Sequence, residues 1–308
     1  MIMTTQPHAE QLQTSATPAT QRLRVSLVQA DLRWEDPAEN CRLLSEQLDA
    51  AGLVASAVAG PEGHNAVTDL IVLPEMFATG FTMNSRQMAE PMATSSSVAW
   101  LKQQAVTRGC VMTGSVAILD GEECYNRMLW ATPDGQVTHY DKRHLFRMAG
   151  EHERYGMGHE RVIVELGGFR IQLSVCYDLR FPTWLRQRPV IGGVSEAEAA
   201  TDSAFEYDLL LCVANWPGVR RHPWRTLLQA RAIENLAYVV GVNRVGDDAN
   251  GLHYTGDSMV CDFKGEPILD PVPDQPFIET VTLERAALDE FRTKFPAWMD
   301  ADHFILEA

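Results

Sequence analysis

A cysteine directly follows a strand-like apolar segment within the stretch 169-FRIQLSVCYDLRFP-182. Apolar residues alternate from Phe169 to Val175, which predicts a buried strand, and Pro182 fits the first turn of a new helix. Cys176 is therefore expected on the turn, where its thiol points out of the sheet beside backbone N–H groups that lack strand partners. A nucleophile next to such donors can carry out acyl transfer. A lone cysteine in an apolar run is more often a small core residue, so the prediction depends on further groups.

Two such groups also follow predicted strands. Glu75 comes after 70-LIVLP-74, and Lys142 comes after 136-QVTHYD-141. Ligands of α/β folds bind at strand ends, and these residue types suit one reaction. The carboxylate takes the thiol proton, the thiolate attacks a carbonyl carbon, and the ammonium stabilises the oxyanion. A glutamate after a proline is also common in surface turns, and a lysine in a DKR run is often solvated, so both interpretations stay open.

Composition limits the class of protein. The chain has 308 residues and a net charge of −15, which disfavours a general nucleic-acid surface or binding to an anionic membrane. No apolar run reaches the length of a membrane span. The six cysteines are widely spaced without a CxxC pair, and no secretion signal is recognised, so we expect free thiols in a cytoplasmic protein.

No cofactor is expected. Histidines are frequent around Lys142, but neither an HExxH motif nor another metal-ligand spacing occurs, and the proposed chemistry needs no metal. Glycine-rich phosphate-binding loops are also absent from the sequence.

The order of predicted elements favours two packed sheets. Strands are expected at 23–30, 70–74, 110–119, 125–132, 136–142, 161–166, 169–175, 208–215, 237–245, 254–263 and 277–283. Helices are expected at 37–58, 96–108, from about 182, 223–235 and 284–294. This order fits mixed sheets packed face to face with helices on both outer faces.

The chain is expected to form one domain. Residues 1–21 have the polar, alanine- and proline-rich composition of a disordered tail, and no linker interrupts 22–308, the single predicted domain. The small, acidic stretch 189–206 is expected to be an inserted loop.

Three segments carry a family resemblance. The stretches 70-LIVLPEMFATGF-81, 139-HYDKRHLF-146 and 175-VCYDLRFP-182 resemble, in order and approximate spacing, the signature motifs of the nitrilase superfamily of carbon–nitrogen hydrolases. The resemblance covers about residues 22 to 300. It implies an α/β fold, namely a four-layer α-β-β-α sandwich of two mixed sheets with helices on the outer faces.

The resemblance also implies roles for individual residues. Glu75 would be the general base, Lys142 the oxyanion stabiliser and Cys176 the nucleophile. The backbone N–H of Tyr177 would be a second oxyanion donor. A second glutamate of the family falls in 151-EHERYGMG-158, where Glu151 is the candidate and Glu153 the alternative. The two carboxylates should keep Lys142 charged, and Lys142 should favour the thiolate of Cys176.

Within the superfamily, the resemblance extends to the omega-amidases, which hydrolyse the side-chain amide of 2-oxoglutaramate or 2-oxosuccinamate. The stretches that support it are 144-HLFRMAGEH-152, 214-ANWP-217, 229-QARAIENLAYVVGVNRVG-246 and 294-KFPAWMDAD-302. Such a substrate carries a carboxylate, so the pocket needs a cation or spare N–H donors. The available arginines are Arg180, Arg220 and Arg221, although Arg180 is expected rather to pair with Asp178 and fix the turn. Phe81 and Trp216 are candidates for the pocket wall or for plain core.

Alternatives remain at this point. Another amide or carbamoyl substrate of the same superfamily would use the same residues, and a non-catalytic scaffold protein on this fold would need none of them. A homodimer or larger assembly is implied by the resemblance alone, through the region of helix 223–235. The expected partner is a small-molecule amide, with no nucleic acid and no membrane.

Overall fold

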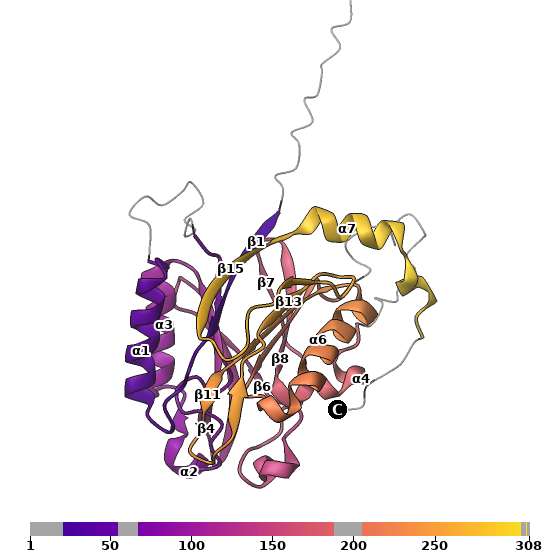
Figure 1. Cartoon of the computed structure of the whole chain (residues 1–308). Coiled ribbons are helices and arrows are strands. Elements are labelled where there is room, and N and C mark those ends of the chain that lie inside the picture. Colours follow the sequence, from indigo (N-terminus) through magenta and orange to yellow (C-terminus); the bar gives the residue numbers. More distant parts are fainter. Residues whose placement is uncertain (1–20, 55–66, 188–204, 303–305, 307–308) are drawn as a thin grey trace, which may run out of the picture.

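The computed structural model describes residues 21–54, 67–187, 205–302 and 306 (Figure 1). The predicted tail 1–21 therefore lies, except for Gln21, outside the described residues. The same holds for the predicted insertion 189–206, of which only Phe205 and Glu206 are described.

Two mixed sheets form the centre of the fold. The first has the order β15-β1-β2-β4-β5-β6, with β3 paired to β4, and the second has the order β14-β13-β10-β9-β8-β7. In the first sheet β1, β2 and β4 are parallel neighbours, and in the second β8, β9 and β10 are. The remaining pairings are antiparallel except that of β3 with β4.

The strands of the first sheet are β1 (Arg22–Gln29), β2 (Leu70–Val72), β3 (Glu90–Pro91), β4 (Val111–Asp120), β5 (Glu123–Ala131), β6 (Val137–Asp141) and β15 (Phe277–Glu284). Those of the second are β7 (Ile163–Leu166), β8 (Phe169–Val175), β9 (Leu209–Ala214), β10 (Tyr238–Asn243), β13 (Met259–Cys261) and β14 (Pro267–Leu269). A separate hairpin consists of β11 (Val245–Asp247) and β12 (His253–Thr255).

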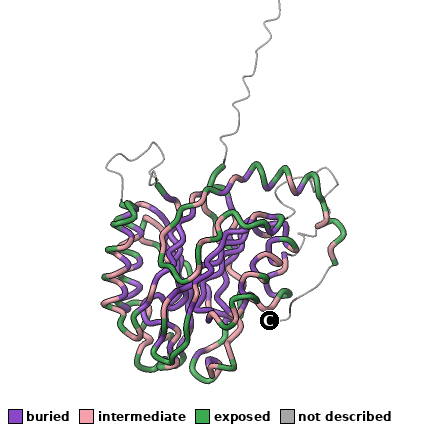
Figure 2. Tube along the Cα trace, in the orientation of Figure 1, coloured by how far each residue is buried: buried purple, intermediate pink, exposed green. Residues whose placement is uncertain are grey.

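The described residues form α-helices of different lengths beside the sheets. They are α1 (Pro37–Ala50), α2 (Ser85–Met88), α3 (Ser96–Arg108), α4 (Pro182–Leu185), α6 (Arg221–Asn235) and α7 (Arg285–Lys294). Figure 1 shows α1 and α3 against the first sheet and α6 against the second, which gives the predicted α-β-β-α sandwich. In Figure 2 the strands between the helices are buried, while α1 exposes its outer face.

Two apolar clusters hold these layers together. One contains Leu44 of α1 and Leu101 of α3 with Ile71 of the first sheet. The other joins both sheets and α6, and it includes Val25, Leu173, Val213 and Leu228. The apolar strand positions found in the sequence therefore become the contacts between layers, as burial of apolar surface requires.

The first helix is shorter than predicted. Asp36 accepts a hydrogen bond from the N–H of Glu39, which caps the N-terminus, but the helix ends at Ala50 instead of Val58. Gly52 follows with a φ of +71°, a left-handed conformation that stops helices. Leu53 lies beyond the end of the helix and is still buried in the core.

The two predicted strands near the C-terminus are also divided. The predicted strand 237–245 ends at Asn243, and the predicted strand 254–263 consists of β12 and β13, which belong to different sheets. Gly256 and Asp257 between them have φ values of +76° and +58°, and two such left-handed residues in succession interrupt an extended strand. Short elements such as β14 were not predicted, because a three-residue strand leaves little periodicity.

Gly241 lets α6 lie close to β10. A β-carbon at this position would meet Leu228 Cδ1 at 2.6 Å and Trp224 Cζ2 at 3.0 Å. We expect Gly241→Ala to lower the free energy of unfolding by about 1 to 3 kcal/mol, because a closely packed layer resists an added methyl group. Urea unfolding would measure it.

The matched control is the same substitution in a Leu228→Ala background. In that background the clash with Leu228 is removed, so Gly241→Ala should lower the free energy of unfolding by less than about 1 kcal/mol. Additive effects of the two substitutions would contradict this packing argument.

Candidate active site

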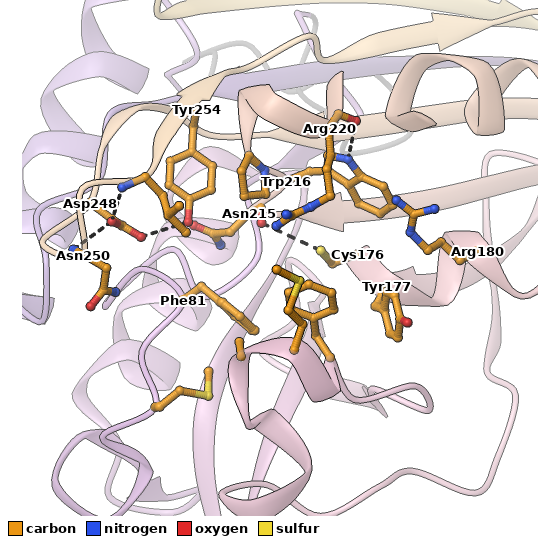
Figure 3. A pocket seen from close by; sticks show the side chains of 16 residues that line it. Phe81, Cys176, Tyr177, Arg180, Asn215, Trp216, Arg220, Asp248, Asn250 and Tyr254 are labelled. Carbon is orange, nitrogen blue, oxygen red and sulfur yellow. Dashed lines mark hydrogen bonds between the residues drawn. The ribbon is translucent and has the colours of Figure 1, made fainter. Parts of the chain in front are cut away.

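The turn after β8 presents Cys176 at the floor of a pocket. Val175 ends the strand, and Cys176 begins a 3-10 helix, Cys176–Arg180, with a φ of +48°. A side chain rarely adopts this left-handed conformation, and such strain is concentrated at functional sites. Cys176 is 8% exposed, and its Sγ lies 3.9 Å from the backbone oxygen of Asn215 (Figure 3). The predicted position of Cys176 between a strand and a helix is what the structure has.

Glu75 is fully buried just beyond β2. Its Oε1 accepts hydrogen bonds from Asn126 Nδ2 at 2.7 Å and from Lys142 Nζ at 2.9 Å. Its Oε2 accepts one from the backbone N–H of Asn215 at 2.7 Å. Asn215 also donates from its side chain to the backbone oxygen of Glu75. Glu75 is therefore held rigidly against the end of β9, whose last residue precedes Asn215.

Lys142 lies between two carboxylates, with no part of its side chain exposed. Its Nζ is 2.9 Å from Glu75 Oε1 and 2.9 Å from Glu151 Oε2. Glu151 also accepts a hydrogen bond from the N–H of Phe146 at 2.6 Å, whereas the side chain of Glu153 is 68% exposed. Of the two candidates for the second glutamate, the structure therefore brings Glu151 to the lysine.

The charges of this buried cluster shift the pKa values of its members. Burial alone would lower the pKa of Lys142, but the charges of Glu151 and Glu75 outweigh it and raise that pKa well above its ordinary value. Burial raises the pKa of Glu151, while Lys142 opposes the rise and Glu75 adds to it. The lysine is therefore an ammonium at neutral pH, as predicted.

The pKa of the Cys176 thiol is set by opposing effects. Burial, reinforced by the negative charge of Glu75, raises the pKa of Cys176 well above its ordinary value, and Lys142 only partly offsets this. Lys142 therefore favours the thiolate, as expected, but burial and Glu75 together outweigh it, and the net shift favours the thiol. An attack by sulfur in this site needs a base that removes the proton as the reaction proceeds.

The pocket above Cys176 has a volume of about 330 Å³. Phe81 and Trp216, the two candidates for the pocket wall, line it, and so do Tyr177 and Arg180. Phe81 also places its ring centroid 5.0 Å from Lys142 Nζ, so it covers the ammonium. Figure 3 shows Arg180 and Tyr177 on one side of Cys176 and Asp248 with Tyr254 on the other.

The predicted pairing of Arg180 with Asp178 is not formed. The Asp178 carboxylate instead accepts hydrogen bonds from Tyr140 and His144, and the Arg180 guanidinium lies 4.9 Å from the ring centroid of Trp216. Asp178 is turned into the protein, whereas Arg180 lies on the pocket side of the same turn.

Of the other two candidate arginines, only one lines the pocket. Arg220 lines the pocket, with its guanidinium 5.3 Å from the ring centroid of Phe146. Arg221 instead pairs with Asp257 at 2.6 Å and is not among the residues that line the pocket. Within the described part of the chain, neither Arg180 nor Arg220 has a carboxylate within 4.0 Å.

Sequence reasoning missed several residues of the site. Asn126 lies in the middle of β5, where nothing local distinguishes it, although it donates to both Glu75 and Glu151. Asn215 is the last residue of the predicted strand 208–215 and lies in the stretch 214-ANWP-217, which is a usable signal. The β11–β12 hairpin contributes Asp248 and Tyr254 to the pocket, and only its fold in space brings it there.

The described ranges lack two kinds of feature. They contain no group of three or more histidine, cysteine, aspartate or glutamate side chains that could hold a metal ion. None of the helices that the structure describes combines the length and hydrophobicity that a membrane crossing requires.

Comparison with known proteins assigns the class. The model of the family described as carbon-nitrogen hydrolase matches residues 24–293, so the chain belongs to the carbon–nitrogen hydrolase family, in the nitrilase superfamily. Together with a thiol, two carboxylates and a buried lysine, this makes the protein a thiol-dependent C–N hydrolase of the amidase type.

Named relatives are more specific. The chain is 44% identical to "Omega-amidase YafV" of Escherichia coli (strain K12), over 92% of this chain and 98% of that protein. It is 29% identical to "2-oxoglutaramate amidase" of Bacillus subtilis, over 90% and 96%. The solved structure of XC1258 from Xanthomonas campestris, a CN-hydrolase superfamily protein, has 45% identity and a TM-score of 0.82, covering 93% of this chain and 99% of that one.

The different surroundings of Glu151 and Glu153 should give their substitutions different effects on stability. We expect Glu151→Gln to lower the free energy of unfolding by about 2 kcal/mol, because it removes a charge-assisted hydrogen bond from a buried ammonium. Glu153→Gln, on the exposed neighbour, should change it by about 0.5 kcal/mol or less. Equal effects in urea unfolding would contradict the placement of Glu151 beside Lys142.

Proposed function

We propose that this protein is an omega-amidase that hydrolyses the side-chain amide of short 2-oxo dicarboxylic acid monoamides, such as 2-oxoglutaramate and 2-oxosuccinamate. The observation that carries the proposal is a nucleophilic thiol on the floor of a small pocket that also holds two guanidinium groups without carboxylate partners. An amide to be cleaved and a carboxylate to be bound match these two features. The names of the relatives support the same substrate class.

The first half of the proposed reaction forms a thioester. Glu75 removes the proton from Cys176 as the sulfur attacks the amide carbon, which the raised pKa of the thiol makes necessary. The carbonyl oxygen becomes an oxyanion, stabilised by the Lys142 ammonium and the backbone N–H of Tyr177. The C–N bond then breaks, and Glu75 returns the proton to the departing nitrogen, which leaves as ammonia.

The second half releases the acid. Glu75 takes a proton from a water molecule, whose oxygen attacks the thioester carbon, and the same two donors stabilise the second oxyanion. The C–S bond breaks, and the proton returns from Glu75 to Cys176. Glu151 acts through Lys142 in both halves, since its charge keeps the buried amine protonated.

The substrate carboxylate is proposed to bind Arg180 and Arg220, while the rings of Phe81 and Trp216 enclose the short carbon chain. Guanidinium groups bind carboxylates through paired, charge-assisted hydrogen bonds. The partial burial of this corner of the pocket strengthens the interaction relative to water.

The assembly is proposed on the family resemblance alone, and the location on the widely spaced cysteines, which include no CxxC pair. We infer a homodimer or larger homo-oligomer in the cytoplasm. Light scattering on the purified protein would test the assembly, and a monomeric mass at working concentration would refute it.

The central test is ammonia release from 2-oxoglutaramate, compared with glutamine and simple aliphatic amides. We expect clear preference for 2-oxoglutaramate and no turnover by Cys176→Ala, because no other group in the pocket can form the thioester. Circular dichroism would verify that the variant is folded. Full turnover by Cys176→Ala would disprove the mechanism, and a preference for glutamine would disprove the substrate class.

The role of the arginines can be tested separately. Arg180→Gln and Arg220→Gln should each lower kcat/KM for 2-oxoglutaramate by about 30-fold, the effect of losing one charged hydrogen-bonding partner. Arg221→Gln, next in sequence but paired with Asp257, is the control and should change it little. A neutral amide without a carboxylate should be hydrolysed equally by all of these variants. Equal losses on that substrate would contradict carboxylate binding.

A further inference from the structure

Asp178 has four hydrogen-bond donors around one buried carboxylate. Its Oδ1 accepts from the backbone N–H of His144 at 2.9 Å and lies 2.8 Å from His144 Nδ1. Its Oδ2 accepts from the Tyr140 hydroxyl at 2.7 Å and from the backbone N–H of Val175 at 3.0 Å. The residue is not exposed at all, so each of these bonds is formed without competition from water.

These donors flank the reacting groups in the chain. Tyr140 and His144 lie two residues before and two residues after Lys142, and Val175 directly precedes Cys176. Asp178 itself belongs to the 3-10 helix that begins at Cys176. A single carboxylate therefore joins the segment that carries the ammonium to the turn that carries the thiol.

The two segments belong to different sheets. Lys142 follows β6 in the first sheet, where its backbone N–H donates to Asn126 of β5 at 3.0 Å. Cys176 follows β8 in the second sheet. Their relative position is thus not set by strand pairing, and it depends on side chains that cross between the layers.

Neighbouring residues hold Tyr140 and His144, the two side chains that bind Asp178, in place. The Tyr140 hydroxyl also accepts hydrogen bonds from Trp184 Nε1 at 3.1 Å and from the backbone N–H of Arg143 at 3.2 Å. The His144 ring stacks on Phe181 with the centroids 3.7 Å apart. Both partners of Asp178 are therefore fixed in orientation by residues other than Asp178.

We propose that Asp178 is a positioning residue, which fixes the Lys142 ammonium relative to the Cys176 thiol so that ammonium and Tyr177 N–H converge on one oxyanion. It touches neither substrate nor reacting atoms. The inference rests on the proposed hydrolysis, because an oxyanion forms only during that reaction. Its predicted signature is a loss of transition-state stabilisation, with ground-state binding preserved.

The test is Asp178→Asn, which keeps the size of the side chain but replaces one acceptor oxygen by a donor. We expect kcat for 2-oxoglutaramate to fall about 10- to 100-fold per competent thiol, with KM within about threefold of wild type. Competent thiols are counted from the burst of p-nitrophenol released by p-nitrophenyl acetate, so that loss of folded protein does not lower the measured kcat.

Asp208→Asn is the matched control. Asp208 is equally buried and bound by charged groups, Arg170, Arg285 and Arg292, but it precedes β9 at the end opposite to Asn215. Its substitution should lower the melting temperature while kcat per competent thiol stays within about twofold of wild type.

Tyr140→Phe removes one of the four hydrogen bonds to Asp178 and replaces Asp178→Asn as the test variant if Asp178→Asn does not fold. It should lower kcat by about 3- to 10-fold.

Two results would overturn the inference. One is a wild-type kcat per competent thiol in Asp178→Asn, or in Tyr140→Phe if only that variant folds. The other is an equal fall of kcat in Asp208→Asn. Failure of the proposed function gives a different result, because the wild-type protein would then release no ammonia from 2-oxoglutaramate. In that event the role of Asp178 is still tested, by comparing the burst rates of the variants and the wild type with p-nitrophenyl acetate.

Discussion

The whole site depends on a cation that water cannot reach. The Lys142 ammonium has no exposed surface, and leaving it unpaired would cost several kcal/mol. Glu75 and Glu151 supply two carboxylates at 2.9 Å, and together they hold the ammonium charged despite its burial. This requirement brings the chain after β2 against the segment that runs from the end of β6 to the 3-10 turn at Glu151, although Glu75 and Lys142 are 67 residues apart in the sequence.

The sandwich supplies the surface on which they meet. The ends of β2, β8 and β9 open toward the same region, and the bonds between Asn215 and Glu75 join the two sheets there. The nucleophile comes from one sheet, and the base and cation come from the other. A site built across two layers stays in register only if the layers cannot slide, which the shared apolar core between them provides.

The pocket also shows how little overall charge says about local chemistry. The chain carries a net charge of −15, yet the corner of the pocket near Trp216 presents two guanidinium groups. An anionic substrate would be repelled weakly at a distance, because salt screens charges beyond about 8 Å. It would be attracted strongly at contact, so local pairing decides binding.

The sequence by itself determined the sandwich, most of its elements and the positions of Glu75, Lys142 and Cys176 at strand ends. Local sequence patterns predict these features, for example the alternating apolar residues of β8 and the turn residues after it. Only the tertiary structure decided that Glu151 and not Glu153 reaches Lys142, that Asp178 leaves Arg180 free to face the pocket, and that the resting Cys176 is a thiol. The physical reason is that periodicity is a property of neighbouring residues, whereas hydrogen-bond partners and desolvation depend on segments that meet only after folding.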